Sequence, residues 1–573
     1  MANRATRFLL SLFLLGLSSS VLYIRRTPID GYTLDIYADP WAGMVILALI
    51  VAGTIAYVTI DPTYETPFLG IGIVAIWLIL SFPLIRGYFY YGTGDPLSHL
   101  GFLRVIIDTG NVDLIYPSKF TMSAFTVLLT DRSLRFGLLL SSSVLMIPWL
   151  IFLPLSARIT YRGSLPVLGW VVPWSILLIT PISTFPRPHP ATEALFLSPL
   201  ILYVYLRGLR SGIFQVFFGI VYLFSLLLHP LIAVSMLFLL VTHLAISWWI
   251  SEVRKPRMLF ILFGAAVVSW AWIQSTRAFT IIVATTTVKI VYSGVATGGG
   301  ASSRVSSLTA VGVNPVYYGA KVGFKYIVFG LLGGSSVLFA AYRRDRSKLA
   351  LAFSSISLVV LTGVFVASGK LNIWTRAFAL LMILVTIFAI HGVARYFPSS
   401  AGTTPDRRYI IGLVVIVGVL SAILTIHPSP YTLQPNNQVS EATFEGYETS
   451  FAYQKPGIRR TETRPRSFRY AQAIYGLSFG TTTRDVSHYE SDKIPDHFRN
   501  RRLGEDREPK YLTITRADFV TDARLYGGFR YTSGDFAYLR TEPAVQRVVD
   551  SGGLTHYYVR ANASEEDETR SGP

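Results

Sequence analysis

The sequence contains no cysteine and little charge. Without cysteine it has no disulfides, no thiol catalysis and no cysteine-ligated zinc or iron–sulfur site. Charged residues make up 15% of the 573 residues, whereas about 25% is usual for soluble domains. Hydrophobic residues make up 51%, and the mean hydropathy is +0.47. This composition excludes a string of ordinary soluble domains and predicts a polytopic membrane protein.

Several catalytic motifs are also missing from the sequence. It has no glycine-rich phosphate loop, no Ser-His-Asp order, no zinc-protease histidine pair and no internal repeat. The run Gly298-Gly299-Gly300 favours a flexible linker over a phosphate cradle. These absences argue against nucleotide-dependent and metalloprotease chemistry.

The net charge of +18 is unevenly distributed. Residues 1–426 hold 31 basic and 13 acidic side chains, whereas residues 427–573 hold 20 of each. The whole excess therefore belongs to the apolar part of the chain. A basic nucleic-acid-binding domain is not indicated, and the excess instead reports membrane orientation and candidate anion contacts.

Apolar runs of bilayer-spanning length recur through residues 1–426, and we expect a mainly α polytopic bundle of about thirteen transmembrane helices. The first run follows Arg4 and Arg7 and is interpreted as an uncleaved signal anchor. The expected spans lie near residues 7–24, 41–60, 68–86, 133–155, 165–183, 191–207, 212–228, 231–250, 258–276, 322–341, 348–367, 375–394 and 409–426.

The chain is expected in the cell membrane, and basic residues in its short loops predict that the N-terminus lies in the cytoplasm. If the spans alternate, the loops near residues 158–162, 207–210, 254–257, 343–348 and 395–408 share that side. Residues 427–573 then form an extracytoplasmic domain. Alternating runs at 510–514 and 556–559 suggest strands of a mixed α/β fold, and residues 565–573 suggest a disordered end. The sequon Asn562-Ala563-Ser564 agrees with an external position.

The external loop 87–132 carries the first candidate site. After Gly92-Thr93-Gly94-Asp95, a helix is expected from Pro96 to about Asp108, with Gly110 ending it. One interpretation is that Asp95 only caps this helix. The other is that Asp95, assisted by His99, removes a proton from an attacking hydroxyl or helps to hold a divalent metal such as Mg or Mn. His99 and Arg104 are expected to face water or a cleft.

Two further external turns carry ionisable residues. In Phe185–Glu193, Pro190 is expected to open a helix with Glu193 in its first turn. The plain interpretation is a rigid turn. The functional one is that Arg187 and His189 contact a phosphate while Glu193 orients one of them. His229 precedes Pro230 at the end of a span, and a surface histidine at a helix break is the plain interpretation. Parity places it on the same face as His99 and His189, which leaves a metal site open.

A fourth segment, Gly369–Arg376, lies between two spans on the external side. Tryptophan and basic residues at this depth are typical of interfacial anchors. The alternative is a clamp on a lipid phosphate, in which Arg376 donates two hydrogen bonds and Lys370 adds a point charge.

The carboxylate in a large external loop, the amphipathic helix after it and the many spans resemble the membrane glycosyltransferases of the GT-C fold. Segment 94–110 and the Pro-His-Pro turn at 188–190 resemble archaeal members, including dolichol-phosphate-mannose-dependent enzymes. Gly94-Asp95-Pro96 stands where many members have a paired acidic dipeptide, and the Trp-Trp-Asp motif of oligosaccharyltransferases is absent.

The resemblance implies transfer of a sugar, with mannose as one candidate, from a polyprenyl-phosphate carrier to an extracytoplasmic lipid- or protein-linked glycan or protein acceptor. Asp95 and His99 would be catalytic, and the donor phosphate would contact residues from several loops. The alternatives are a flippase or transporter of lipid-linked glycans, which predicts midplane charges and repeats, and a polysaccharide polymerase or ligase. The candidate substrate-binding residues are Arg104, Arg187, His189, Glu193, His229, Lys370 and Arg376.

Overall fold

A computed structural model describes most of the chain. The residues outside the described part are 1, 30, 61–64, 113–115, 162–185, 252–254, 277–307, 311, 368–370, 397–412, 414–416, 418–422, 477–490, 495–497, 504–507 and 562–573. Lys370, the Gly298–Gly300 run, the sequon at Asn562 and the end at 565–573 therefore lie outside the described residues.

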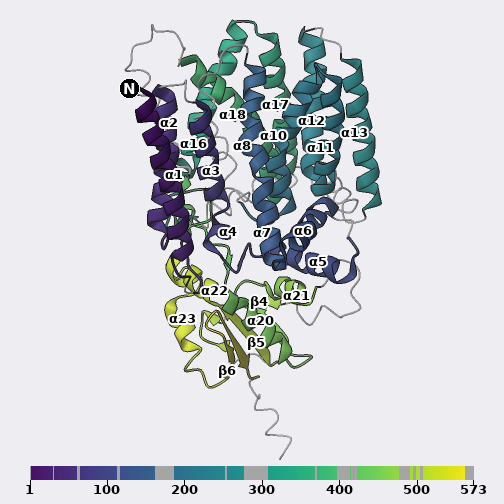
Figure 1. Ribbon diagram of the computed structural model, residues 1–573. Coiled ribbons are helices and arrows are strands. Elements are labelled where there is room, and N and C mark those ends of the chain that lie inside the picture. Colours follow the sequence, from purple (N-terminus) through teal and green to yellow (C-terminus); the bar gives the residue numbers. More distant parts are fainter. Residues whose placement is uncertain are drawn as a thin grey trace, which may run out of the picture.

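Long apolar helices form a bundle, and a smaller α/β domain lies at one end of it (Figure 1). Within the bundle, α16 packs on α18, α12 on α17, and α10 on both α8 and α11. The bundle comprises α1 (Ala2–Arg26), α2 (Trp41–Ile60), α3 (Glu65–Leu80), α7 (Leu134–Leu145), α8 (Ile147–Thr160), α10 (Pro190–Gly208), α11 (Gly212–Leu228), α12 (Pro230–Ser251), α13 (Pro256–Ser275), α16 (Pro315–Tyr342), α17 (Arg346–Ala367) and α18 (Leu371–Tyr396).

The bundle has the composition of a membrane domain. In the described part, seven helices are long and apolar enough to cross a membrane, and three shorter apolar helices accompany them. Large apolar side chains such as Phe8, Trp249 and Phe260 are exposed on the surface of the bundle. Contact of such a surface with water is unfavourable, whereas contact with lipid is not. The chain is a multi-pass membrane protein. The predicted spans coincide with helices except 165–183 and most of 409–426, which lie outside the described residues.

Proline and capping side chains set where many of these helices begin. Helices α10, α12, α13 and α16 all start with proline, which lacks the N–H that would be unpaired there. Ahead of α16, the side chain of Asn314 accepts from the N–H groups of Val316 and Tyr317. The predicted span at 133–155 is divided at Met146 into α7 and α8, two residues before Pro148.

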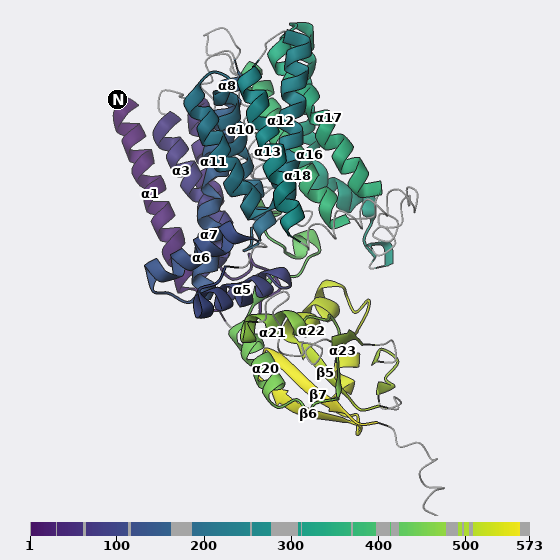
Figure 2. The ribbon, with the colours of Figure 1, turned by 90° about the vertical axis from the view of Figure 1, so that its right-hand side faces the viewer.

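Two short helices lie across the end of the bundle that faces the α/β domain (Figure 2). Helix α5 (Asp95–Thr109) ends at Gly110 in the left-handed conformation, as predicted, and α6 (Pro117–Thr130) follows it. Leu97, Leu100 and Leu103 of α5 are buried, in an apolar cluster that also contains residues of the α/β domain. Helix α5 is therefore an interface helix between the two parts.

The α/β domain contains a five-stranded mixed sheet with the order β4-β3-β5-β7-β6. β3 runs parallel to β4 and β5, whereas β7 is antiparallel to β5 and β6. The predicted strands at 510–514 and 556–559 correspond to β5 and β7. The elements are α20 (Glu441–Ala452), β3 (Arg459–Glu462), α21 (Ser467–Tyr475), β4 (Ser491–Lys493), β5 (Lys510–Thr515), α22 (Arg516–Val520), α23 (Ser533–Tyr538), β6 (Val545–Asp550) and β7 (Leu554–Val559).

A second, two-stranded sheet joins the α/β domain to the loop that bears Asp95. β1 (Tyr90–Tyr91) pairs antiparallel with β2 (Gln438–Val439). The ladder continues in the bond from the N–H of Gly92 to the carbonyl of Asn437, 2.8 Å. The loop after α1 also contacts this segment, because the hydroxyl of Tyr32 donates to the carbonyl of Asn436 at 2.9 Å. Three segments distant in sequence are thus fixed together beside α5.

Candidate active site

Asp95 is the first residue of α5, directly after Gly94 with φ +81°. Gly94, and not Asp95, is the N-cap residue of α5, so the interpretation that Asp95 only caps this helix is wrong. Oδ1 lies 2.9 Å from a guanidinium nitrogen of Arg469, and Oδ2 lies 3.6 Å from Nε2 of His189. The Asp95 side chain is 52% exposed, so it remains accessible beside both partners.

The surroundings of Asp95 favour its ionised form. Its contact with His189 is the largest influence on its pKa, and the charge of Arg469 acts in the same direction. Burial opposes them but does not prevail, so the pKa of Asp95 lies well below its ordinary value. The site therefore holds a carboxylate at neutral pH.

The hydrogen bonds of His189 fix its tautomer. Nδ1 accepts from the backbone N–H of Ala191 at 3.2 Å, which makes His189 the N-cap of α10. Burial lowers the pKa of His189 to about 4, so the ring is neutral at pH 7. With Nδ1 accepting, the proton is on Nε2, the atom that faces Asp95. His189 therefore presents an N–H group toward the carboxylate, 3.6 Å from Oδ2.

His99 is buried, contrary to the prediction that it faces water or a cleft. Its ring contacts those of Tyr116, Phe120 and His189, the last with centroids 5.6 Å apart. Neither ring nitrogen has a hydrogen-bond partner in the described part of the chain. Burial, with help from the neighbouring His189, holds the pKa of His99 well below its ordinary value. A neutral imidazole with unpaired nitrogens thus lines the site.

Two arginines near the carboxylate of Asp95, Arg187 and Arg376, form the cationic wall of the site. Arg376, near the start of α18, donates to Nε2 of His229 at 3.2 Å. His229 is buried and stacks on Tyr116, with centroids 5.6 Å apart, so it is not the surface histidine of the plain interpretation. Arg187 lies behind the loop at Gly92, and burial lowers its pKa to about 10, so it stays charged at pH 7. Arg187 and Arg376 both lie within electrostatic range of Asp95.

Glu193 does not orient Arg187 or His189, and that prediction is wrong. Its carboxylate binds the ammonium group of Lys119, and the hydroxyl of Ser142 donates to it. Both charged side chains are fully buried, and Lys119 also donates to Ser142 at 2.9 Å. Burial lowers the pKa of Lys119, an effect that Glu193 opposes. The pair joins α6, α7 and α10 beneath the site.

Arg104 also lies away from the carboxylate. Arg104 lies further along α5 than Asp95, and its side chain runs beside Gly476 at the end of α21. The predicted site residues that the structure brings together are Asp95, His99, Arg187, His189, His229 and Arg376.

No preformed metal site is evident. In the described ranges, no group of three or more His, Asp or Glu side chains is arranged to hold a metal ion. Asp95 already has a guanidinium on one oxygen. We therefore derive no chemical step through a metal.

Three contributors were missed from the sequence: Arg469, Tyr116 and Lys119. The only local signal for Lys119 is a lone cation in the apolar stretch 117–130. Nothing near Arg469 in the sequence indicates that it reaches Asp95, because the contact spans most of the chain.

No protein-family model and no curated protein sequence matches the chain. Solved structures with a similar course of the chain exist. Archaeal oligosaccharyltransferase AglB from Archaeoglobus fulgidus, in complex with an inhibitory peptide and a dolichol-phosphate, is 11% identical with a TM-score of 0.44, over 86% of this chain and 74% of that one.

Two further similar structures belong to bacteria. ArnT from Cupriavidus metallidurans bound to undecaprenyl phosphate is 11% identical with a TM-score of 0.46, over 87% of this chain and 98% of that one. Arabinofuranosyltransferase AftD from Mycobacteria is 13% identical with a TM-score of 0.45, over 93% of this chain and 41% of that one. Likeness at this level gives no residue correspondence, so function rests on the side chains of the site.

Proposed function

We propose that the chain is a membrane glycosyltransferase of GT-C type. It transfers a sugar from a polyprenyl-phosphate carrier to an acceptor hydroxyl or amide outside the cytoplasm. The observation that carries the proposal is the ionised carboxylate of Asp95 within electrostatic range of two half-buried arginines, Arg187 and Arg376, at one end of an apolar bundle. A lipid-borne phosphate and a polar acceptor can meet only at such a boundary.

The reaction needs two opposite electrostatic environments. The acceptor oxygen forms a bond to the anomeric carbon while the bond from that carbon to the phosphate oxygen breaks, and the phosphate leaves with the electron pair. Negative charge therefore grows on the phosphate, and Arg187 and Arg376 are the cations in place to stabilise it. A single displacement of this kind inverts the anomeric centre.

Asp95 serves the acceptor side. Its low pKa makes it a weak base, so it first orients the acceptor by accepting its hydrogen bond. The proton moves to the carboxylate late, when the acceptor oxygen or nitrogen has become positive through bond formation. Nε2–H of His189 faces the carboxylate, 3.6 Å from Oδ2, and can stabilise its charge.

Transfer of labelled sugar from a polyprenyl phosphate by the purified protein in lipid vesicles tests the proposal. Asp95→Asn should lower the rate by about 10²- to 10⁴-fold, the usual contribution of a positioned acid or base. Asp492→Asn is the matched control, because Asp492 also sits 2.9 Å from an arginine, Arg459, but on the edge strand β4 of the sheet and without a contact to Asp95 in the described residues. Full transfer by Asp95→Asn would refute the assignment.

The same vesicles separate transfer from transport. If labelled lipid-linked sugar crosses the bilayer without being consumed, a flippase replaces the enzyme as the function. Mannose and other donor sugars can be compared in this assay to find the one that is used.

A further inference from the structure

The α/β domain packs closely on the helix that carries Asp95. At Gly101 of α5, an added Cβ would lie 2.1 Å from the carbonyl oxygen of Gln472, so only glycine permits this approach of α21. Tyr470, Ala471 and Ile474 of α21 share an apolar cluster with α5. The contact between α21 and α5 is therefore a close-packed one, in which side chains of α21 have defined positions.

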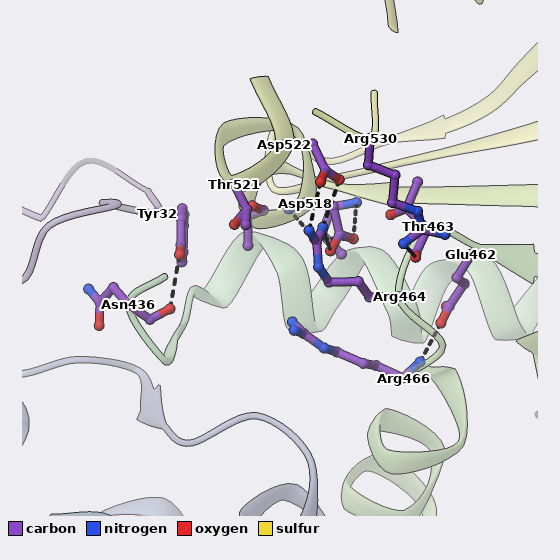
Figure 3. Close-up of polar contacts among 12 residues, drawn as sticks. Tyr32, Asn436, Glu462, Thr463, Arg464, Arg466, Asp518, Thr521, Asp522 and Arg530 are labelled. Atoms are coloured by element: carbon purple, nitrogen blue, oxygen red, sulfur yellow. Dashed lines mark hydrogen bonds and ion pairs between the residues drawn. The ribbon is translucent and has the colours of Figure 1, made fainter. Parts of the chain in front are cut away.

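Buried polar contacts fix the turn from which α21 starts (Figure 3). Glu462, at the end of β3, accepts from the backbone N–H of Arg466 and from that of Ser467 at 3.1 Å. Next to it, Arg464 makes two hydrogen bonds to the carboxylate of Asp522, at 2.8 and 2.9 Å, and a third to Asp518 at 3.3 Å. This network anchors the first turn of α21 to the sheet.

From this anchored helix, Arg469 reaches across to α5. One of its terminal nitrogens lies 2.9 Å from Oδ1 of Asp95, and the other donates to the hydroxyl of Ser98 at 2.8 Å. Ser98 in turn donates to the side-chain oxygen of Gln472 at 2.5 Å. The fork of the guanidinium is thus held by two groups of α5, one turn apart.

Oδ1 of Asp95 is consequently paired with Arg469, whereas Oδ2 lies 3.6 Å from Nε2 of His189, beyond hydrogen-bonding distance. Without the contact to Arg469, the half-exposed carboxylate would sample other rotamers. We infer that Arg469 is a positioning residue of the transfer reaction, through which the α/β domain aims the carboxylate of Asp95 at the acceptor. This inference rests on the proposed function, and it assigns to the α/β domain a part in the site itself.

The test compares Arg469→Gln and Arg469→Lys with the matched control Arg459→Gln, whose ion pair joins the strands β3 and β4 of the sheet. Arg469→Gln should lower kcat on the order of 10- to 100-fold with little change of the donor KM, because misaimed groups slow the chemical step. Arg469→Lys should recover part of kcat, since an ammonium can still reach Asp95. Ser98→Ala, which frees the other side of the fork, should give a smaller loss.

Equal kcat values for wild type and Arg469→Gln, while Asp95→Asn is inactive, would overturn the inference. A kcat for Arg469→Lys that is no higher than the kcat for Arg469→Gln would also overturn the inference. If Arg469→Gln does not accumulate in folded form, Arg469→Lys and Ser98→Ala carry the same comparison.

A second measurement keeps the inference apart from the proposed function. If the wild type shows no transfer, thermal unfolding is measured for Asp95→Asn, Arg469→Gln and the double variant. A double variant that shifts Tm no more than the larger single shift supports the pairing that the inference needs. Additive shifts would overturn it, independently of any activity.

Discussion

Two carboxylate–cation pairs, Lys119–Glu193 and Asp95–Arg469, differ in their access to water. Lys119 and Glu193 are fully buried among hydroxyl groups, whereas Asp95 is half exposed beside Arg469. A fully buried pair can meet no substrate. An exposed pair adds little stability but leaves a charged group available. Burial thus separates a pair that supports the site from one that can act in it.

The largest expected effect is on stability, at the buried pair. Lys119→Ala leaves the carboxylate of Glu193 buried without its cation, and this should cost about 3–5 kcal/mol of unfolding free energy. Thermal or denaturant unfolding in detergent measures it. The double variant Lys119→Met with Glu193→Leu removes both charges and should be more stable than Lys119→Ala. If the two are equally destabilised, the pair is not the source of the loss.

An intermediate effect is expected at the cationic wall. Arg376→Ala removes a guanidinium that is oriented by its hydrogen bond to His229. Binding of the lipid-phosphate sugar and its transfer should each weaken by about 1.5–3 kcal/mol, the value of a charged hydrogen bond. Arg376→Lys should recover only part, because lysine lacks the planar fork. Transfer rates at several donor concentrations provide the measurement, with Arg540→Ala in the α/β domain as control. An Arg376→Ala enzyme with wild-type kinetics would remove this residue from the phosphate site.

A smaller effect concerns pH. The pKa of His189 falls from 6.5 to about 4 on folding, so the unfolded chain binds a proton between these values that the folded chain does not. Stability should therefore decrease as pH falls from 6.5 to 4, by on the order of 1 kcal/mol per pH unit at most for this group.

His189→Asn provides the comparison, because asparagine can still cap α10 but does not titrate. Its Tm should depend less on pH in this window than the Tm of the wild type. An unchanged slope would mean that His189 is charged in the folded protein. Asp95 contributes separately: its stabilising effect is complete above its unfolded pKa and is lost at lower pH.

The smallest effect is the stability change at the exposed pair. Asp95→Asn should change the unfolding free energy by no more than about 1 kcal/mol, as is usual for exposed ion pairs. Tm measured beside Lys119→Ala gives the contrast directly. A loss at Asp95 as large as that at Lys119 would show that the two pairs do not differ in the way described.

The sequence predicted most of the bundle because bilayer-spanning helices need long apolar runs. Counting these runs also placed Asp95, His189, His229 and Arg376 on one face, and these side chains do meet. Their partners were less predictable. Helix periodicity does not tell which side of α5 packs against a neighbouring element, so the sequence predicts that His99 faces water or a cleft, although it is buried against Tyr116 and Phe120.

Long-range docking explains the remaining errors. Glu193 was assigned to its neighbours in sequence, but Lys119 of a different helix is its partner. Arg469 looked like one of many arginines in a neutral domain, because its role depends on the approach of α21 to Gly101. Such contacts depend on how whole elements pack, and no local pattern encodes them.

The pairing of β1 with β2 also sets an order of events during biosynthesis. Residues 90–91 leave the ribosome long before residues 438–439, so the loop with Asp95 must wait while most of the bundle is inserted. The contact between Ser98 and Gln472 closes a separation of 374 residues. A nascent chain that has completed its bundle therefore still lacks an assembled site. The site is therefore completed only when the last quarter of the chain has been synthesised.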